Sequence, residues 1–242
     1  MHRVEPDANG EETHIMGQMI EFKRPDGKAA SGYLATPAEG QAKPGNPAVL
    51  VIQEWWGVNP QIKSVADRYA AHGYLALVPD LYDGKVATNP TEASSLMQKL
   101  DFVAATDQIV QGGLNALKAK GAGKVGLTGY CMGGAVTFLG ASRLKGLAAA
   151  VAFYGLPSQG FDPATITIPV MGHFASKDGF IPIAKVYEFE ATLKKAGVDV
   201  RFFTYEADHA FCNETRPEVY NPEAAKLADE RTFAFFAEHL GS

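Results

Sequence analysis

One of the two cysteines in this 242-residue chain stands in a glycine-rich turn, within the stretch KVGLTGYCMGGAVTFLG (124–140). Before Cys131 the sequence has the apolar character of a buried strand, and a helical pattern begins at Met132. A Gly-x-Cys-x-Gly pattern between a strand and a helix is typical of a sharp turn that lifts the central side chain above a sheet. The helix N-terminus beside it favours a thiolate, the nucleophilic form of cysteine. We therefore expect Cys131 to be a nucleophile, with a buried structural cysteine as the alternative.

A thiol nucleophile needs a base, and the base needs an acid that orients it. Among six histidines, His209 follows a strand pattern directly, in the loop ADHAF, and so should lie at the strand end where Cys131 also points. His173 falls inside an apolar strand pattern and is expected in the core. Asp178, just past the preceding strand in FASKDGFIP, is the candidate acid, and Asp208 and Asp162 are its rivals.

The order of these candidates along the chain is nucleophile, acid, base. Glutamine-amidotransferase-like folds use a similar turn, but they more naturally carry a His-x-Glu pair late in the sequence, and this chain has none there. Three candidates in this order, each past a strand, are far more specific than any one alone.

An oxyanion formed during attack on a carbonyl needs two backbone N–H donors. The turn at the nucleophile supplies the N–H of Met132, and the stretch QEWWGVN is placed to supply a second from Trp55. Glu54 beside it is unusual, because a carboxylate near a thiolate should be repelled; the alternative is a helix-capping or salt-bridged surface acid. Trp55 and Trp56 are alternatively plain core aromatics.

The elements that must position these residues alternate along the chain. Apolar runs bounded by turn residues predict strands, and apolar residues at helical spacing predict helices. The predicted strands cover 18–24, 31–37, 48–54, 74–82, 124–129, 147–155, 168–176 and 198–206; the predicted helices cover 60–73, one or two segments of 91–120, 132–144, 183–197 and 222–240. This alternation predicts an α/β fold with a mostly parallel central sheet and helices on both faces.

Composition narrows the classes of function. The net charge of −5 gives no reason to expect nucleic acid or an anionic membrane as a partner. No apolar run reaches the roughly 20 residues of a membrane-spanning helix, and the N-terminal residues lack the apolar stretch of a secretory signal. Two cysteines without zinc-ligand spacing predict no metal or other cofactor and favour a cytoplasmic protein. We expect a flexible arm over 1–17 and one domain over 18–242, in a monomer or small homo-oligomer.

Several stretches together resemble the dienelactone hydrolases (carboxymethylenebutenolidases) of the α/β-hydrolase superfamily. They are QEWWGVN, GYLALVPDLY, KVGLTGYCMGGA, FYG, GHFASKDGFIP, ADHAF and ERTFAFF, and they run from about residue 15 to the C-terminus. Cysteine in the elbow is specific to this group, since most relatives carry serine. The resemblance implies an α/β-hydrolase fold and a triad of Cys131, His209 and Asp178.

The resemblance also implies roles around the triad. Glu54 should contact the resting thiol and help to activate it once substrate binds, and Tyr82 and Tyr154 should line the substrate pocket. Trp56 is a further candidate for substrate binding.

The chain departs from the family pattern at the residues that bind the carboxylate of the substrate. Members that act on dienelactone hold this group with two arginines. One belongs near Ser94 and Ser95, where no arginine occurs, and the other shortly after the histidine, where Asn213 stands. Arg216 is a candidate replacement, alternatively an exposed loop cation. Without a bidentate clamp, carboxylate recognition should be weak.

These residues predict hydrolysis of a small ester or lactone through a thioacyl-enzyme intermediate. One alternative is a broad carboxylesterase with promiscuous activity on activated phosphoesters. Another is a ligand-binding or sensing protein on a hydrolase fold that is acylated once and turns over slowly. Thioesterase or peptidase action also stays open.

Overall fold

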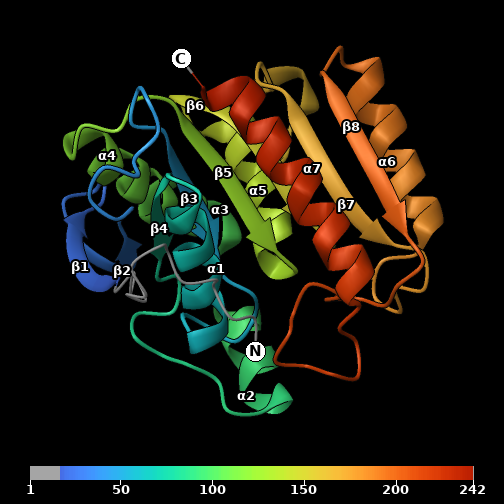
Figure 1. Cartoon of the computed structure of the whole chain (residues 1–242). Helices are drawn as coiled ribbons and strands as arrows, with labels where there is room; N and C mark the ends of the chain where they lie inside the picture. The colour runs from blue at the N-terminus through green and yellow to red at the C-terminus, as the bar shows by residue number, and fades with distance from the viewer. Residues whose placement is uncertain (1–16, 242) are drawn as a thin grey trace, which may run out of the picture.

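A computed structural model describes residues 17–241, so the arm predicted for 1–17 lies outside the described residues except for Gly17. The described chain forms an eight-stranded sheet in the order β1-β2-β4-β3-β5-β6-β7-β8 (Figure 1). The strands are β1 (Gln18–Lys23), β2 (Ala29–Ala35), β3 (Ala48–Ile52), β4 (Leu75–Pro79), β5 (Val125–Tyr130), β6 (Leu147–Phe153), β7 (Val170–Ala175) and β8 (Val200–Tyr205). From β4 to β8 the sheet is parallel, and β1 and β2 add an antiparallel edge.

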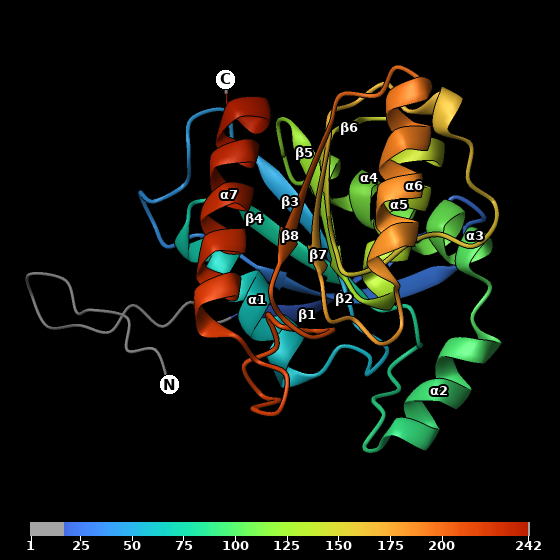
Figure 2. The same ribbon diagram turned by 90° about the vertical axis from the view of Figure 1, so that its right-hand side faces the viewer.

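Helices cover both faces of this sheet, which Figure 2 shows nearly edge-on. On one face lie α1 (Pro60–Ala71) and α7 (Pro222–Leu240); on the other lie α4 (Gln111–Ala119), α5 (Met132–Arg143) and α6 (Ile183–Lys195). Between β4 and α4 the chain forms α2 (Pro90–Lys99), α3 (Phe102–Ala104) and a π-helical turn, η1 (Ala105–Val110), and a short 3₁₀ turn, η2 (Pro163–Thr165), precedes β7. The predicted α/β architecture is confirmed.

The central strands form because they are continuous apolar runs. Every residue of β3, β4 and β5 is buried, as expected for parallel strands covered on both sides. Three helices that leave the carboxyl edge of the sheet, α1, α2 and α7, all begin with an Asn-Pro pair. In each, the asparagine side chain accepts a hydrogen bond from a backbone N–H of the first turn, and proline occupies the first helical position.

The carboxyl ends of the strands are in register. Ile52 pairs with Gly129, Tyr130 with Phe153, and Phe153 with His173. The loops that follow β3, β5, β6, β7 and β8 therefore gather along one edge, the lower edge of the sheet in Figure 1. This edge is where the predicted site residues should meet. Within the described chain, no helix has both the length and the apolar character needed to cross a bilayer.

Candidate active site

The turn between β5 and α5 holds Cys131 in a strained conformation. Its φ of 56° and ψ of −116° lie where a non-glycine residue rarely stands, and its N–H donates to the carbonyl oxygen of Phe153 at 3.0 Å. The glycines allow close approach: a Cβ on Gly134 would lie 2.5 Å from the Phe153 carbonyl oxygen, and one on Gly133 2.5 Å from that of Ile52. The local sequence thus produces a nucleophile-elbow geometry, with the thiol only half-buried.

The structure brings the three predicted triad residues together. Cys131 Sγ lies 3.1 Å from His209 Nε2, and His209 Nδ1 lies 2.7 Å from Asp178 Oδ2. The other carboxylate oxygen of Asp178 accepts the backbone N–H groups of Phe180 and Ile181 at 2.8 and 2.9 Å. One oxygen of this acid is therefore fixed by its own loop, while the second is directed at the imidazole.

Electrostatics favour the charged form of His209. Burial by itself lowers the pKa of the imidazole, but hydrogen bonds to Asp178 and Cys131 outweigh it and raise the pKa to about 10. The side chain is only 13% exposed. An imidazolium that lies within hydrogen-bond distance of a thiol sulfur stabilises the thiolate.

The rival acids and the other strand histidine lie elsewhere. Asp162 caps η2 through its side chain, and Asp208 lines a separate surface pocket described below. His173 is fully buried between the Tyr205 hydroxyl at 2.8 Å and the Thr232 hydroxyl at 3.0 Å, and burial lowers its pKa to about 3. The prediction that His173 is a core residue is confirmed.

Glu54 is buried beside the triad and held by two neutral donors. Tyr154 Oη donates to Oε1 at 3.3 Å, and Asn213 Nδ2 donates to Oε2 at 3.0 Å. Asn213 Oδ1 accepts both the N–H and the hydroxyl of Thr215, so its amide nitrogen must face Glu54. Burial raises the pKa of Glu54, against the smaller opposing effects of Asn213 and the nearby His209 charge.

The expected contact between Glu54 and the resting thiol is not among the hydrogen bonds of the described residues. The Cys131 sulfur is paired with His209, and each oxygen of Glu54 accepts a bond from another side chain. The hydrogen bond from Asn213 instead joins this carboxyl to the loop after β8.

Backbone strain concentrates around these groups. Tyr154 has a φ of 37° and Ala210, directly after His209, a φ of 65°. The N–H of Tyr154 is tied to the His173 carbonyl oxygen at 2.8 Å, and its ring lies edge-on to His209, with 5.2 Å between ring centroids. Together with Cys131, these residues make three strained positions at one place, as occurs where side chains must be aimed at a common point.

The loop after β4 brings Tyr82 against the elbow. Tyr82 Oη donates to Met132 Sδ at 3.2 Å. Two buried side chains fix the loop: Asp80 accepts the N–H of Tyr82 at 2.8 Å, and Gln53 accepts the N–H of Leu81 at 3.2 Å. Sequence reasoning missed Gln53 and Asp80, although a polar residue directly after a buried strand was the available signal.

Aromatic residues lie in the loops after β3 and β7. Trp55 and Trp56 are half-buried and packed edge-to-face at 5.2 Å, and Trp55 leans on the core layer beneath α5. The Trp56 carbonyl oxygen accepts the N–H of Ala87, which joins this stretch to the loop after β4. Phe180 is 77% exposed and lies 5.0 Å from the His209 ring; sequence reasoning missed it.

The predicted oxyanion donors come from two turns at the carboxyl edge of the sheet, those after β5 and β3. Met132 is the first residue of α5, so its N–H has no partner within the helix, and Trp55 lies in the turn after β3.

The remaining substrate-binding candidates differ in placement. Asn213 is buried and bonded to Glu54, whereas Arg216 lies near the surface with Nε 2.8 Å from Glu218. Its charge reaches Glu54 only as a minor influence. Cys212 is buried in the core, and burial raises the pKa of its thiol.

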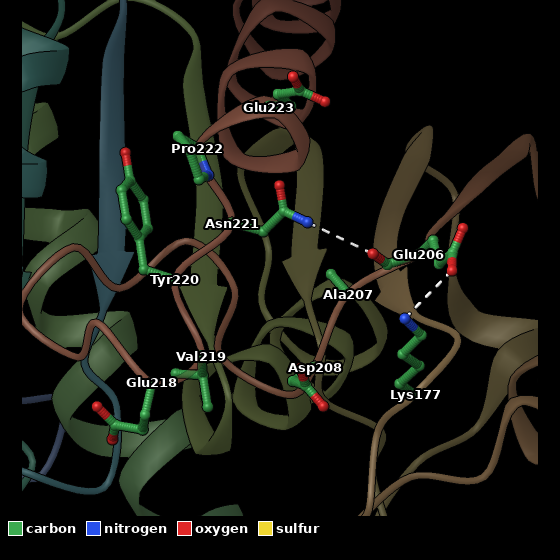
Figure 3. A pocket seen from close by; sticks show the side chains of 10 residues that line it. All are labelled: Lys177, Glu206, Ala207, Asp208, Glu218, Val219, Tyr220, Asn221, Pro222 and Glu223. Carbon is green, nitrogen blue, oxygen red and sulfur yellow. Dashed lines mark hydrogen bonds and ion pairs between the residues drawn. The ribbon is translucent and has the colours of Figure 1, made fainter.

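A surface pocket of about 420 Å³ is lined by Lys177, by residues 206–208, which directly precede His209 in the chain, and by residues 218–223 (Figure 3). Four of its ten lining residues are acidic. Lys177 lies 3.1 Å from Glu206, and the Asn221 amide donates to the Glu206 carbonyl oxygen. No triad residue lines it. In the described part of the chain, no cluster of histidine, cysteine or acidic side chains is arranged to hold a metal ion.

Comparison with known proteins gives a consistent family. The sequence model of the "Dienelactone hydrolase family" matches residues 30–240. "Protein usf" of Aquifex pyrophilus is 39% identical over 93% of this chain and 100% of its own length. A "Putative carboxymethylenebutenolidase" of Aquifex aeolicus is 36% identical over the same shares.

Solved structures agree on the fold. The dienelactone hydrolase-like promiscuous phosphotriesterase P91, from metagenomic libraries, superposes with a TM-score of 0.81 at 24% identity, over 93% of this chain and 99% of its own. The matched family segment contains the elbow, the acid loop and the histidine loop. The chain therefore belongs to the dienelactone hydrolase family and is an ester hydrolase.

Proposed function

We propose that this protein hydrolyses small, uncharged esters or lactones with Cys131 as the nucleophile, through a thioacyl-enzyme intermediate. One observation carries the proposal: the continuous contact from the Cys131 sulfur through both nitrogens of His209 to Asp178. A nucleophile, a base and an orienting acid in this arrangement are what acyl transfer requires.

In the proposed reaction Cys131 rests as a thiolate beside a His209 imidazolium. The sulfur attacks the carbonyl carbon, and the oxyanion is held by the N–H groups of Met132 and Trp55. As the carbon–oxygen bond breaks, His209 gives its proton to the departing oxygen. The neutral imidazole then takes a proton from water, and the resulting hydroxide attacks the thioester. Collapse releases the acid and restores the thiolate, while Asp178 keeps Nδ1 protonated throughout.

The surroundings of Glu54 support an uncharged substrate. This buried carboxyl faces two neutral donors, Tyr154 and Asn213, and the nearby Arg216 is already paired with Glu218. An anionic group brought into this corner would lose its hydration without gaining a bidentate cationic partner. Dienelactone carries such a group, so we propose that neutral esters and lactones are preferred to it.

Activated phosphotriesters are a second candidate substrate class. They are uncharged, and a thiolate beside an imidazolium is suited to attack phosphorus as well as carbon. The name of the structural neighbour P91 includes this activity. Here it is proposed as a side activity of the same triad.

The decisive experiment is steady-state hydrolysis of p-nitrophenyl acetate and of dienelactone by wild type, Cys131→Ala and Cys212→Ala. We expect turnover of the acetate by wild type and by Cys212→Ala, whose thiol lies in the core, and none by Cys131→Ala. A wild-type burst of one equivalent of nitrophenol without turnover would instead favour the sensing alternative. Retained activity in Cys131→Ala would disprove the role of the elbow.

We further propose that the enzyme works in the cytoplasm without a cofactor, and without nucleic acid or membrane as a partner. Both cysteines of the described chain are free thiols, which suits a reducing compartment.

A further inference from the structure

The hydroxyl of Tyr82 is a buried donor with a weak partner. Tyr82 is 6% exposed, and its Oη donates to the thioether sulfur of Met132 at 3.2 Å. Sulfur in a thioether is a poor hydrogen-bond acceptor. A buried hydroxyl in such a bond retains most of its capacity to donate to a better acceptor.

Three other tyrosine hydroxyls of the described chain have stronger partners, although the buried hydroxyl of Tyr130 has none. Tyr33 donates to the Asp67 carboxylate at 2.9 Å, Tyr154 to Glu54 at 3.3 Å, and the Tyr205 oxygen accepts from Arg231 at 3.0 Å. These contacts fix their hydroxyls. The hydroxyl of Tyr82 is held much less firmly.

The backbone of Tyr82 is nevertheless fixed. Its N–H is bound by the Asp80 carboxylate, which also accepts the N–H of Gly84 at 2.6 Å, and Gln53 holds the preceding residue. Burial, with a smaller effect of Cys131, raises the pKa of Tyr82, so the phenol is a neutral donor at working pH. The ring is therefore pre-positioned, and only the direction of the O–H can change.

The position of the Met132 sulfur matters as much as its weakness as a hydrogen-bond acceptor. Met132 provides the thioether that holds the phenol and also the N–H that opens α5 beside Cys131. One methionine side chain, that of Met132, therefore separates the phenol from the N–H at which the oxyanion is expected.

We infer that Tyr82 is a catalytic residue, a third donor to the oxyanion that exchanges its bond to the Met132 sulfur for one to the negatively charged oxygen. This inference rests on the proposed function. The exchange of a weak acceptor for a strong one occurs only when charge develops on the oxygen, so it stabilises the transition state more than bound substrate. Such a donor raises kcat and leaves KM nearly unchanged.

The test compares Tyr82→Phe with Tyr33→Phe, which loses a hydroxyl at the far end of the sheet, on β2. With p-nitrophenyl acetate we expect kcat to fall about 100-fold in Tyr82→Phe with little change in KM, the typical loss for one oxyanion donor. Tyr33→Phe should keep the wild-type kcat. Alkylation of Cys131 by iodoacetamide forms no oxyanion, so its rate should be the same in both variants and wild type.

Each other outcome has a definite meaning. A raised KM with unchanged kcat would make Tyr82 a ground-state binding residue, and equal losses in hydrolysis and alkylation would make it a structural one; either overturns the inference. If Cys131→Ala is inactive while Tyr82→Phe keeps kcat, only the inference fails. If Cys131→Ala keeps the wild-type rate, the proposed function fails as well.

Discussion

At the scale of single residues, the site depends on which groups hold His209 and Glu54. His209 has one strong acceptor on each nitrogen, Asp178 and the Cys131 sulfur, and both raise its pKa. Glu54 has two neutral donors and no cation within hydrogen-bond distance among the described residues. The surroundings of His209 thus favour its positive charge, whereas the buried carboxyl of Glu54 nearby disfavours a further negative charge.

Asp178→Asn should lower kcat for p-nitrophenyl acetate by about 10³-fold or more, because the amide cannot hold the imidazole in the required tautomer or stabilise its charge. Asp208→Asn is the matched control, since Asp208 neighbours the histidine in sequence but lines the surface pocket, and it should keep the wild-type rate. Similar losses in both variants would contradict the assignment of the acid.

The pH dependence of alkylation tests the resting charge state. Hydrogen bonds to Asp178 and Cys131 raise the pKa of His209 to about 10, so His209 stays protonated below that pH and keeps a positive charge against the Cys131 sulfur. Iodoacetamide should therefore modify Cys131 at nearly the same rate at about pH 6.5 as at about pH 8.5. A rate that rises tenfold per pH unit across this window would mean a neutral resting thiol. In Asp178→Asn, which removes a group that raises the His209 pKa, the rate at the lower pH should fall.

At the scale of elements, the elbow works because α5 lies very close to β3 and β6. Gly134→Ala would place a Cβ 2.5 Å from the Phe153 carbonyl oxygen, and backbone cannot move aside easily. We expect the free energy of unfolding to fall by about 1–3 kcal/mol, measured by urea denaturation. Gly179→Ala is the control, since its Cβ would meet nothing within 4 Å; an equally large loss there would refute the close-approach explanation.

The alternation of elements and the order of Cys131, Asp178 and His209 were predictable, because both follow from patterns local in sequence. Buried parallel strands read as apolar runs, and parallel strands bring their carboxyl ends to one edge. The partners of Glu54 were not predictable, because Tyr154 and Asn213 come from distant loops whose strained backbone, at Tyr154 and Ala210, decides where they point. The π-helical turn before α4 likewise has no sequence signal that we recognised.

At the scale of the whole molecule, one edge of the sheet carries the triad, Glu54 and the aromatic residues Trp55, Trp56 and Phe180. The chain has a net charge of −5. The net negative charge would repel an anionic substrate as it approaches, and the Glu54 carboxyl would repel it once bound. A neutral substrate would experience neither repulsion. Discrimination by charge should therefore appear in kcat/KM for two substrates of the same shape.

Dienelactone and its methyl ester form nearly such a pair, since they share the scissile lactone and differ in one charge and one methyl group; opening of the lactone ring is the reaction to follow. We expect kcat/KM for the methyl ester to exceed that for the free acid by about tenfold or more, because the missing bidentate contact and the desolvated anion together cost at least about 1.4 kcal/mol. Glu54→Gln, which removes the charge but keeps the shape, should narrow this ratio. Asp107→Asn removes a negative charge that is paired with Arg143 on the opposite face of the sheet from α1 and α7, and it should leave the ratio unchanged. A preference of wild type for the free acid would mean that Arg216 leaves Glu218 to bind the carboxylate, and the corner around Glu54 would then be a carboxylate site after all.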